Sequence, residues 1–275
     1  MEAHETVQVA GARRRLLILG GTGEAAALAE QALERFGSGL EVVTSLAGRL
    51  PRPRTLAGEL RVGGFGGAEG LAAYLRKHEV DLVIDATHPF ASAISTHARE
   101  ACDAAAVPRL MLVRPPWRRA PEDTWLEVAD MDAAARALEG LGRRAWLTVG
   151  ASEIAPFASI RGVWFLVRLI AEPEAPLPLG RHGRDFEIVL GRGPFTVAQE
   201  RRLIERHGID VMVSKLSGGR ATEAKLVAAR EAGLPVVMVR RPTLEPGERV
   251  ESVPAALEWL VDSLERLDDT QAGGA

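Results

Sequence analysis

The chain has 275 residues, of which 47% are hydrophobic and 26% charged, a usage that excludes a disordered or fibrous protein. Its net charge of −3 excludes the strong positive field that binds nucleic acid or an anionic membrane. The single cysteine, Cys102, excludes an internal disulfide, and no apolar run approaches the length of a membrane span. We therefore expect a soluble, cytoplasmic protein of about two domains.

The first half alternates short runs of Val, Ile and Leu with Ala-rich helical stretches. This alternation is typical of a parallel sheet that helices cover on both faces. The pattern predicts strands at 15–19, 40–45, 59–62, 81–85 and 109–113, and helices at 23–36, 68–78 and 90–106.

The same alternation starts again after the stiff segment Pro115-Pro116-Trp117. It predicts strands at 144–148, 163–169, 186–190, 210–214 and 235–239, helices at 132–141, 196–207, 221–232 and 254–267, and a loop at 172–183. We expect an α/β fold of two Rossmann-like lobes with mainly parallel sheets and a crevice between them. The predicted domains are residues 13–115, which would bind NADP, residues 116–268, which would bind substrate, and a disordered tail at 269–275.

A glycine turn joins the first predicted strand to the first predicted helix. The residues Gly20, Gly21, Thr22, Gly23 and Glu24 follow the strand directly. A strand, a glycine turn and a helix N-terminus form an anion site, because the backbone can approach the ligand and free N–H groups face it. We therefore predict that Gly21, Thr22, Gly23 and Glu24 bind a cofactor. The three-glycine dinucleotide fingerprint is incomplete, so a tight turn without a ligand stays the alternative.

The second predicted strand ends without the carboxylate that accepts hydrogen bonds from the ribose of NAD. Its last residues, Thr44 and Ser45, lead instead to Arg49. A guanidinium suits a 2′-phosphate, so this segment favours NADP(H), with Ser45 and Arg49 as cofactor ligands. The alternative is that Arg49 is one of several surface arginines, since Arg52, Arg54 and Arg61 lie nearby in the sequence.

Two further strand ends carry candidate cofactor ligands. The run Gly63–Gly67 holds four glycines, which suits close backbone approach to a ligand, and it includes Gly64 and Phe65. The fourth predicted strand ends in Asp85, Thr87 and His88. We interpret Asp85 and Thr87 as cofactor-binding, while Thr87 could instead cap the next helix. His88 is a candidate general acid or a structural residue of the proline turn.

The second half also places polar residues at strand ends. The chain has only three lysines, and Lys215 follows an apolar strand, where a long cation suits a carboxylate or developing negative charge. We predict Lys215 to be catalytic, and interpret Lys77 and Lys225 as solvated helix residues. The predicted substrate contacts are Ser152, Arg192, Ser217 and Gly218. The six histidines are scattered, so no metal site is predicted.

Taken in order, seven motifs resemble the precorrin-6A reductase family of cobalamin biosynthesis. They begin at Leu19, Ser45, Gly63, Asp85, Trp164, Arg192 and Ser214, and the resemblance runs from about Leu16 to Arg241. It implies an oxidoreductase that uses NADPH to reduce a double bond of precorrin-6A, an anionic tetrapyrrole, and gives precorrin-6B. The cobalt-containing analogue of the anaerobic route is the first alternative.

Other functions and details stay open at this point. An S-adenosylmethionine-dependent methyltransferase and a non-catalytic nucleotide-binding regulator share the glycine turn, but the methyltransferase lacks its ribose carboxylate here. The proton that accompanies the hydride has three candidate sources: His88, Lys215 and water. The sequence does not fix the oligomeric state, and a monomer is among the candidates.

Overall fold

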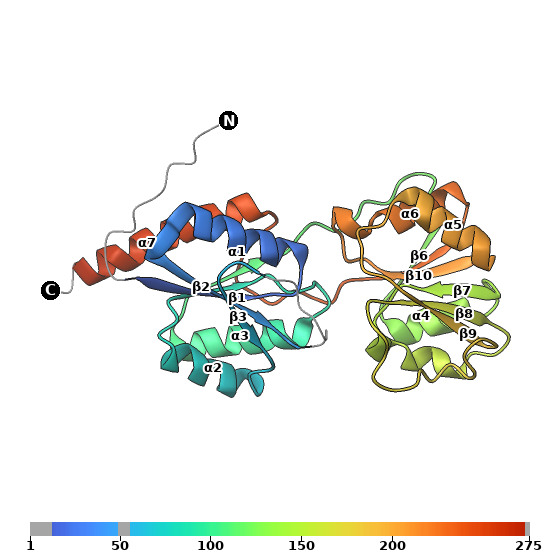
Figure 1. The fold of residues 1–275 in the computed structure, drawn as a ribbon, viewed down its shortest axis with the longest axis horizontal. Coiled ribbons are helices and arrows are strands. Elements are labelled where there is room, and N and C mark those ends of the chain that lie inside the picture. Colours follow the sequence, from blue (N-terminus) through green and yellow to red (C-terminus); the bar gives the residue numbers. More distant parts are fainter. Residues whose placement is uncertain (1–12, 49–55, 273–275) are drawn as a thin grey trace. The chain divides into compact units, whose positions relative to one another are not determined.

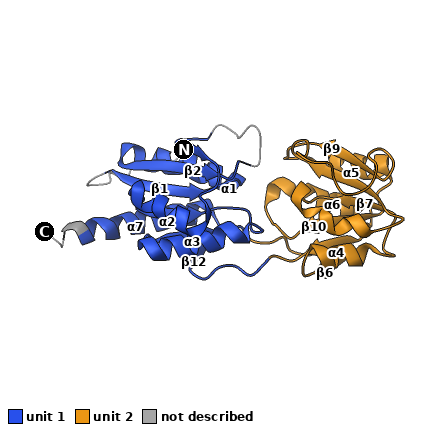
Figure 2. Ribbon diagram, turned by 90° about the horizontal axis from the view of Figure 1, so that it is seen from below, with its two compact units in different colours: residues 1–114, 242–275 blue, residues 115–241 orange. Residues whose placement is uncertain are grey.

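The computed structural model describes residues 13–48 and 56–272, and divides the chain into two compact units. The first unit combines Met1–Arg114 with Pro242–Ala275, and the second spans Pro115–Arg241. Each unit has one six-stranded sheet, and every strand pair in it is parallel. Helices cover both faces of each sheet (Figures 1 and 2), which confirms the predicted α/β fold.

The sheet of the first unit has the order β12-β5-β4-β1-β2-β3. Its strands are β1 (Arg14–Leu19), β2 (Leu40–Leu46), β3 (Glu59–Val62), β4 (Leu82–Asp85), β5 (Arg109–Leu112) and β12 (Glu248–Val250). Its helices are α1 (Gly23–Phe36), α2 (Gly67–Lys77), α3 (Ser92–Ala105) and α7 (Val253–Ala272), with the 3₁₀ turn η1 (Gly37–Gly39). The strand order reverses between β1 and β4, which is where ligands bind in folds of this kind.

Strand β1 shows why helices must cover both faces of this sheet. Successive side chains of a strand point to opposite faces, and four consecutive residues of β1 are at most 2% exposed. Leu16 and Ile18 pack in the cluster that contains α1 and α7, whereas Leu17 and Leu19 pack in the cluster that contains α2 and α3. An apolar run whose side chains alternate between the two faces of a sheet can be buried only in this three-layer arrangement.

The sheet of the second unit has the order β6-β11-β10-β7-β8-β9, and its strand order reverses between β7 and β10. Its strands are β6 (Trp125–Val128), β7 (Arg144–Leu147), β8 (Trp164–Leu169), β9 (Phe186–Leu190), β10 (Val211–Lys215) and β11 (Val236–Val239). Its helices are α4 (Met131–Leu138), α5 (Val197–His207) and α6 (Ala224–Glu231), with the 3₁₀ turns η2 (Ala151–Glu153), η3 (Ala155–Ser159) and η4 (Arg220–Thr222). The fully buried Trp146 lies in the core cluster that contains residues of α5 and α6.

The C-terminal segment corrects the predicted domain boundaries. Residues 242–275 belong to the first unit, where Figure 2 shows α7 in the same colour as β1. Leu257, Leu260 and Leu264 are buried against the α1 side of the first sheet, and Arg14 Nη2 donates to Asp268 Oδ1 over 2.6 Å. The second unit therefore ends at Arg241 rather than 268. The predicted tail is also wrong for residues 269–272, which continue α7, while 273–275 lie outside the described residues.

Two short edge strands, β6 and β12, were not predicted. Residues Leu126 and Glu127 of β6 are exposed, as are Glu248 and Arg249 of β12. Edge strands are short and partly polar, so the periodicity that marks buried strands is missing from them. In the part of the chain that the structure describes, no helix combines the length and the apolarity needed to cross a membrane.

Candidate functional site

The first candidate edge lies at the carboxyl ends of the paired strands β1 and β4. Gly20 N donates to Ser45 O over 2.9 Å, and Ala86 N donates to Leu19 O over the same distance, so the ends of three strands are fixed together. Gly21 has a φ of +115°, which L side chains rarely adopt, and the space where a Cβ would stand is open. The turn thus presents bare backbone at the switch point, as the sequence predicted for a ligand that approaches closely.

Thr22 joins the start of α1 to the end of β4. Its hydroxyl accepts a hydrogen bond from Ala25 N over 3.1 Å and donates to Ala86 O over 2.8 Å. The first N–H groups of a helix have no acceptor within the helix, and those of Gly23 and Glu24 are among them at the start of α1. The carboxylate of Glu24 accepts a hydrogen bond from Arg114 Nη1 over 2.8 Å, so Glu24 forms an ion pair within the first unit.

Arg61 organises the ends of β2 and β3, although the sequence analysis counted it only as a nearby surface arginine. Its guanidinium donates to Ser45 Oγ over 3.3 Å and to the carbonyls of Gly63 and Gly64 over 2.6 and 2.8 Å. Its carbon Cζ also lies 3.7 Å from the centroid of the Phe65 ring. Arg61 therefore holds three of the predicted cofactor ligands in one arrangement: Ser45, Gly64 and Phe65. Arg49 lies outside the described residues.

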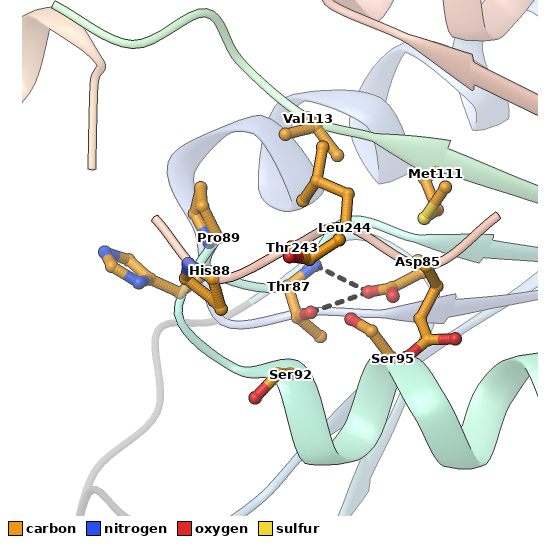
Figure 3. Close-up of a pocket in the computed structure, with 12 residues that line it drawn as sticks. Asp85, Thr87, His88, Pro89, Ser92, Ser95, Met111, Val113, Thr243 and Leu244 are labelled. Atoms are coloured by element: carbon orange, nitrogen blue, oxygen red, sulfur yellow. Dashed lines mark hydrogen bonds between the residues drawn. The ribbon is translucent and has the colours of Figure 1, made fainter. Parts of the chain in front are cut away.

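Asp85 and Thr87 form a closed turn after β4. Asp85 Oδ1 accepts from Thr87 N over 3.1 Å and from Thr87 Oγ1 over 2.6 Å (Figure 3). The alternative that Thr87 caps the next helix is wrong, because α3 begins at Ser92 after Ala91. Figure 3 also shows the imidazole of His88 pointing away from the Asp85 carboxylate, and its Nδ1 accepts from Phe90 N over 3.3 Å.

A pocket at this strand end is closed by a segment that sequence reasoning missed. It is lined by Asp85, Thr87, His88, Ser92, Met111 and the chain from Pro242 to Glu245. Glu245 accepts from Thr96 Oγ1 over 2.6 Å and from Arg99 Nε over 2.8 Å. These two hydrogen bonds hold the pKa of Glu245 below its usual value, and the bond from Thr96 has the larger effect. The returning segment is thus tied to α3 as one wall of the pocket.

The second candidate edge is built around Lys215 at the end of β10. Lys215 Nζ donates to both carboxylate oxygens of Glu153, over 2.8 and 2.9 Å. Glu153 Oε2 also accepts from Gly150 N over 2.9 Å, so the ion pair is fixed to the end of β7. The sequence analysis missed Glu153, whose signal is its position three residues after the strand-end glycine.

The predicted substrate contacts divide into exposed and packed residues. Ser152 and Arg192 are exposed, so both are accessible to a ligand. Ser217 is 7% exposed, and its carbonyl accepts from Arg241 Nη2 over 2.9 Å. A Cβ on Gly218 would lie 2.1 Å from Pro115 O at a φ of +66°, so close chain packing explains this glycine without a ligand.

Lys225 corrects the interpretation of a solvated helix lysine. It is 8% exposed, and its Nζ donates to Thr148 Oγ1 over 3.0 Å and lies 5.6 Å from the centroid of the Trp117 ring. Burial, followed by the charge of Arg168, lowers its pKa to about 7. A lysine that changes its charge near neutral pH thus adjoins the end of β7, next to the Lys215 strand.

The fold and its two switch points define a doubly wound α/β protein with two Rossmann-like units. The chain belongs to the precorrin-6x reductase CbiJ/CobK family, whose family model matches residues 15–261.

Relatives of established name cover nearly the whole chain. A precorrin-6A reductase of Rhodococcus erythropolis is 47% identical over 247 residues, which are 90% of this chain and 97% of that protein. One from Mycobacterium tuberculosis is 43% identical with the same coverage, and a cobalt-precorrin-6A reductase of Priestia megaterium is 28% identical over 90% of this chain and 98% of that protein. A solved structure of CobK precorrin-6A reductase superimposes with a TM-score of 0.85 at 39% identity, covering 91% of this chain and 97% of that one.

Proposed function

We propose that this chain reduces a double bond of the precorrin-6A macrocycle in cobalamin biosynthesis, giving precorrin-6B. The observation that carries the proposal is its membership of the reductase family over residues 15–261, with relatives named precorrin-6A reductase at 39–47% identity. Neither the methyltransferase nor the regulator considered from the sequence fits a reductase family. A reductase of this kind implies a nicotinamide cofactor.

The residues of the first edge fit such a cofactor. The open space at Gly21 and Gly64 lets a ligand reach the backbone, and the α1 N-terminus suits a pyrophosphate. The cofactor, when bound, supplies the hydride. In the proposal Thr22 keeps the α1 N-terminus against β4, Arg61 shapes the glycine run, and Asp85 with Thr87 borders the pocket at the end of β4.

The second edge suits an anionic substrate. Lys215 is the last residue of β10, the exposed Arg192 lies just after β9, and the polar Ser152 is exposed after β7. Cations at such positions attract the carboxylates of a tetrapyrrole, although the chain as a whole carries a net charge of −3. Lys215 would contact the substrate, with Glu153 holding the ammonium in place until a substrate carboxylate approaches.

We further propose that the cofactor is NADP(H) and that Arg49 binds its 2′-phosphate. No carboxylate follows β2 in the sequence, and a charge-assisted hydrogen bond contributes about 1.5–3 kcal/mol. Arg49→Ala should therefore weaken NADPH about ten- to a hundredfold and leave NADH unchanged. Arg61→Ala is the matched control, because its guanidinium contacts Ser45 and two carbonyls of the glycine run. If only Arg61→Ala changes the NADPH-to-NADH ratio, Arg49 is not the phosphate ligand.

The natural substrate in this proposal carries no cobalt. Named precorrin-6A reductases are 39–47% identical to this chain, against 27–28% for named cobalt-precorrin-6A reductases. The test is the anaerobic incubation of the purified protein with NADPH and either precorrin-6A or cobalt-precorrin-6A. The loss of NADPH absorbance is followed together with the mass of the corrinoid product, which rises by two hydrogens on reduction. Turnover of neither substrate contradicts the function, and preference for the cobalt form contradicts the substrate.

A further inference from the structure

The amine of Lys225 is buried beside the carboxyl edge of the second sheet. Lys225 stands in the first turn of α6, and its Nζ donates to the hydroxyl of Thr148 over 3.0 Å. Thr148 directly follows β7 and is half-buried, so it lies at the strand switch point, where this fold binds its ligands. The hydroxyl thus connects a buried amine to the edge assigned to the substrate.

The hydrogen bonds of Thr148 suit transfer of a proton. A hydroxyl has one proton to donate and two lone pairs that accept. Thr148 Oγ1 accepts from Lys225 and donates to Val213 O over 2.9 Å. Rotation about the Cβ–Oγ1 bond turns this proton away from Val213, and the Lys225 ammonium remains in place to replace it.

The charged neighbours of Lys225 are each held in an ion pair. The charges that act on it come from Arg168 on β8, Glu200 on α5 and Lys215 on β10. Arg168 pairs with Glu200, with one contact of 2.8 Å, and Lys215 pairs with Glu153. Within residues 13–48 and 56–272, Lys225 Nζ donates its one hydrogen bond to the Thr148 hydroxyl. Burial and the two cations therefore destabilise its charged form, with Glu200 opposing them.

We propose that Lys225 is the proton reserve of this edge and that Thr148 passes its proton to the substrate; this inference rests on the proposed reductase function. Reduction of a carbon–carbon double bond adds one hydride and one proton. The hydride comes from the reduced cofactor, and the proton leaves Thr148 Oγ1 for the neighbouring carbon. The Lys225 ammonium returns a proton to Thr148 and becomes a neutral amine, which solvent then protonates again.

The two side chains that the sequence offered as proton donors are placed less well for this step. Lys215 Nζ is held by both oxygens of Glu153, where its charge can attract a substrate carboxylate. His88 Nδ1 accepts from the backbone of Phe90, and the imidazole points away from Asp85 (Figure 3). Lys225 is in this scheme a positioning residue that acts through Thr148.

The first test titrates the amine directly and needs no turnover. The chain has only three lysines, so protein labelled with [¹³Cε]lysine gives three signals, which single Lys→Met variants assign. In the intact protein we expect one signal to titrate close to pH 7, with a pKa of about 7, and to vanish in Lys225→Met. Lys77, which is exposed on α2, supplies the reference signal. Titration of all three signals above pH 9.5 overturns the proposal.

The second test separates proton supply from charge. The kcat of the parent for precorrin-6A should fall above pH 7. Lys225→Met should lower kcat at least tenfold at pH 6.5, keep the substrate Kd within threefold, and abolish that dependence on pH. Lys225→Arg keeps the charge but holds its proton, so it should lose as much. Thr148→Val should reproduce this loss, Thr148→Ser should restore turnover, and Lys77→Met should match the parent.

The outcomes distinguish this proposal from the function on which it rests. A parent protein that does not reduce precorrin-6A contradicts the proposed function, and the lysine titration then decides alone on Lys225. An active parent whose Lys225→Arg variant retains full turnover shows that only charge matters, and overturns the proton reserve. An unchanged pH profile in Lys225→Met overturns it as well.

Discussion

Replacing Lys225 with methionine should change how the stability of the second unit depends on pH. The folded protein lowers the pKa of this lysine from 10.5 to about 7, mainly through burial. Between these values the unfolded chain keeps the proton that the folded chain has released. Unfolding then takes up one proton, so the parent gains stability as the pH rises, by about 1.4 kcal/mol per pH unit. Lys225→Met lacks this contribution.

The measured quantity is the difference in unfolding free energy between Lys225→Met and the parent. From pH 7.5 to 9.5 the parent should gain about 2–3 kcal/mol on the variant, towards a limit of about 5 kcal/mol for the full shift. Other titrating groups cancel in this difference. Urea unfolding followed by tryptophan fluorescence suits the assay, because four of the five tryptophans, Trp117, Trp125, Trp146 and Trp164, belong to the second unit.

Lys77→Met provides the matched control, since Lys77 is exposed on α2 of the first unit. Its stability difference from the parent should stay constant over the same pH range. A Lys225→Met difference that is equally constant would mean that the folded protein does not depress the pKa of Lys225. Burial would then not destabilise the ammonium, and Lys225 would not be a proton reserve.

Three further variants or reagents test the two edges and the core. Thr22→Val removes the cap of α1 and the bond to Ala86 O, so it should cost about 1–3 kcal/mol of stability and weaken NADPH, as urea unfolding and fluorescence titration would show. Glu153→Gln frees the Lys215 ammonium from a full negative charge, so the KM for precorrin-6A should fall severalfold; a rise would mean that the position Glu153 gives the ammonium matters more for substrate binding than the charge it neutralises. Cys102 is buried, which raises its pKa to about 12, so a disulfide reagent at pH 8 should leave the native thiol intact and label it on unfolding.

Local patterns explain which parts of the fold could be predicted from the sequence. Buried strands such as β1 carry an unbroken apolar run, here Leu16–Leu19, and a glycine turn follows directly, so the strand and the turn could both be predicted from the sequence. The edge strand β12 has only three residues, two of them charged, and carries no such pattern. The return of α7 to the first unit depends on contacts with α1 that are more than 200 residues distant in sequence. Neither β12 nor the place of α7 could be predicted from a short stretch of sequence.

The site residues that sequence reasoning missed are defined by tertiary contacts. Arg61 looks like one of several arginines until its bonds to Ser45 and the glycine run are seen. Lys225 follows Ala224 in a short helix whose pattern does not reveal which face is buried. Glu245 reaches the pocket of the first edge only because the chain returns from the second unit. The residue type alone could not distinguish these side chains from ordinary charged residues of the surface.

The distribution of charge explains how a chain of net charge −3 can serve an anionic substrate. In the second unit Arg168 is paired with Glu200 and Lys215 with Glu153, and these pairs cancel in total charge. The ammonium of Lys225 contacts the Thr148 hydroxyl instead of a carboxylate, in a buried position where the dielectric constant is low and its field reaches further than at the surface. An anion that binds at this edge stabilises the charged form of Lys225, and a proton-consuming reduction discharges it. If Lys225 is the proton reserve, substrate binding and proton supply are coupled through one side chain, which composition cannot reveal because it counts every charge equally.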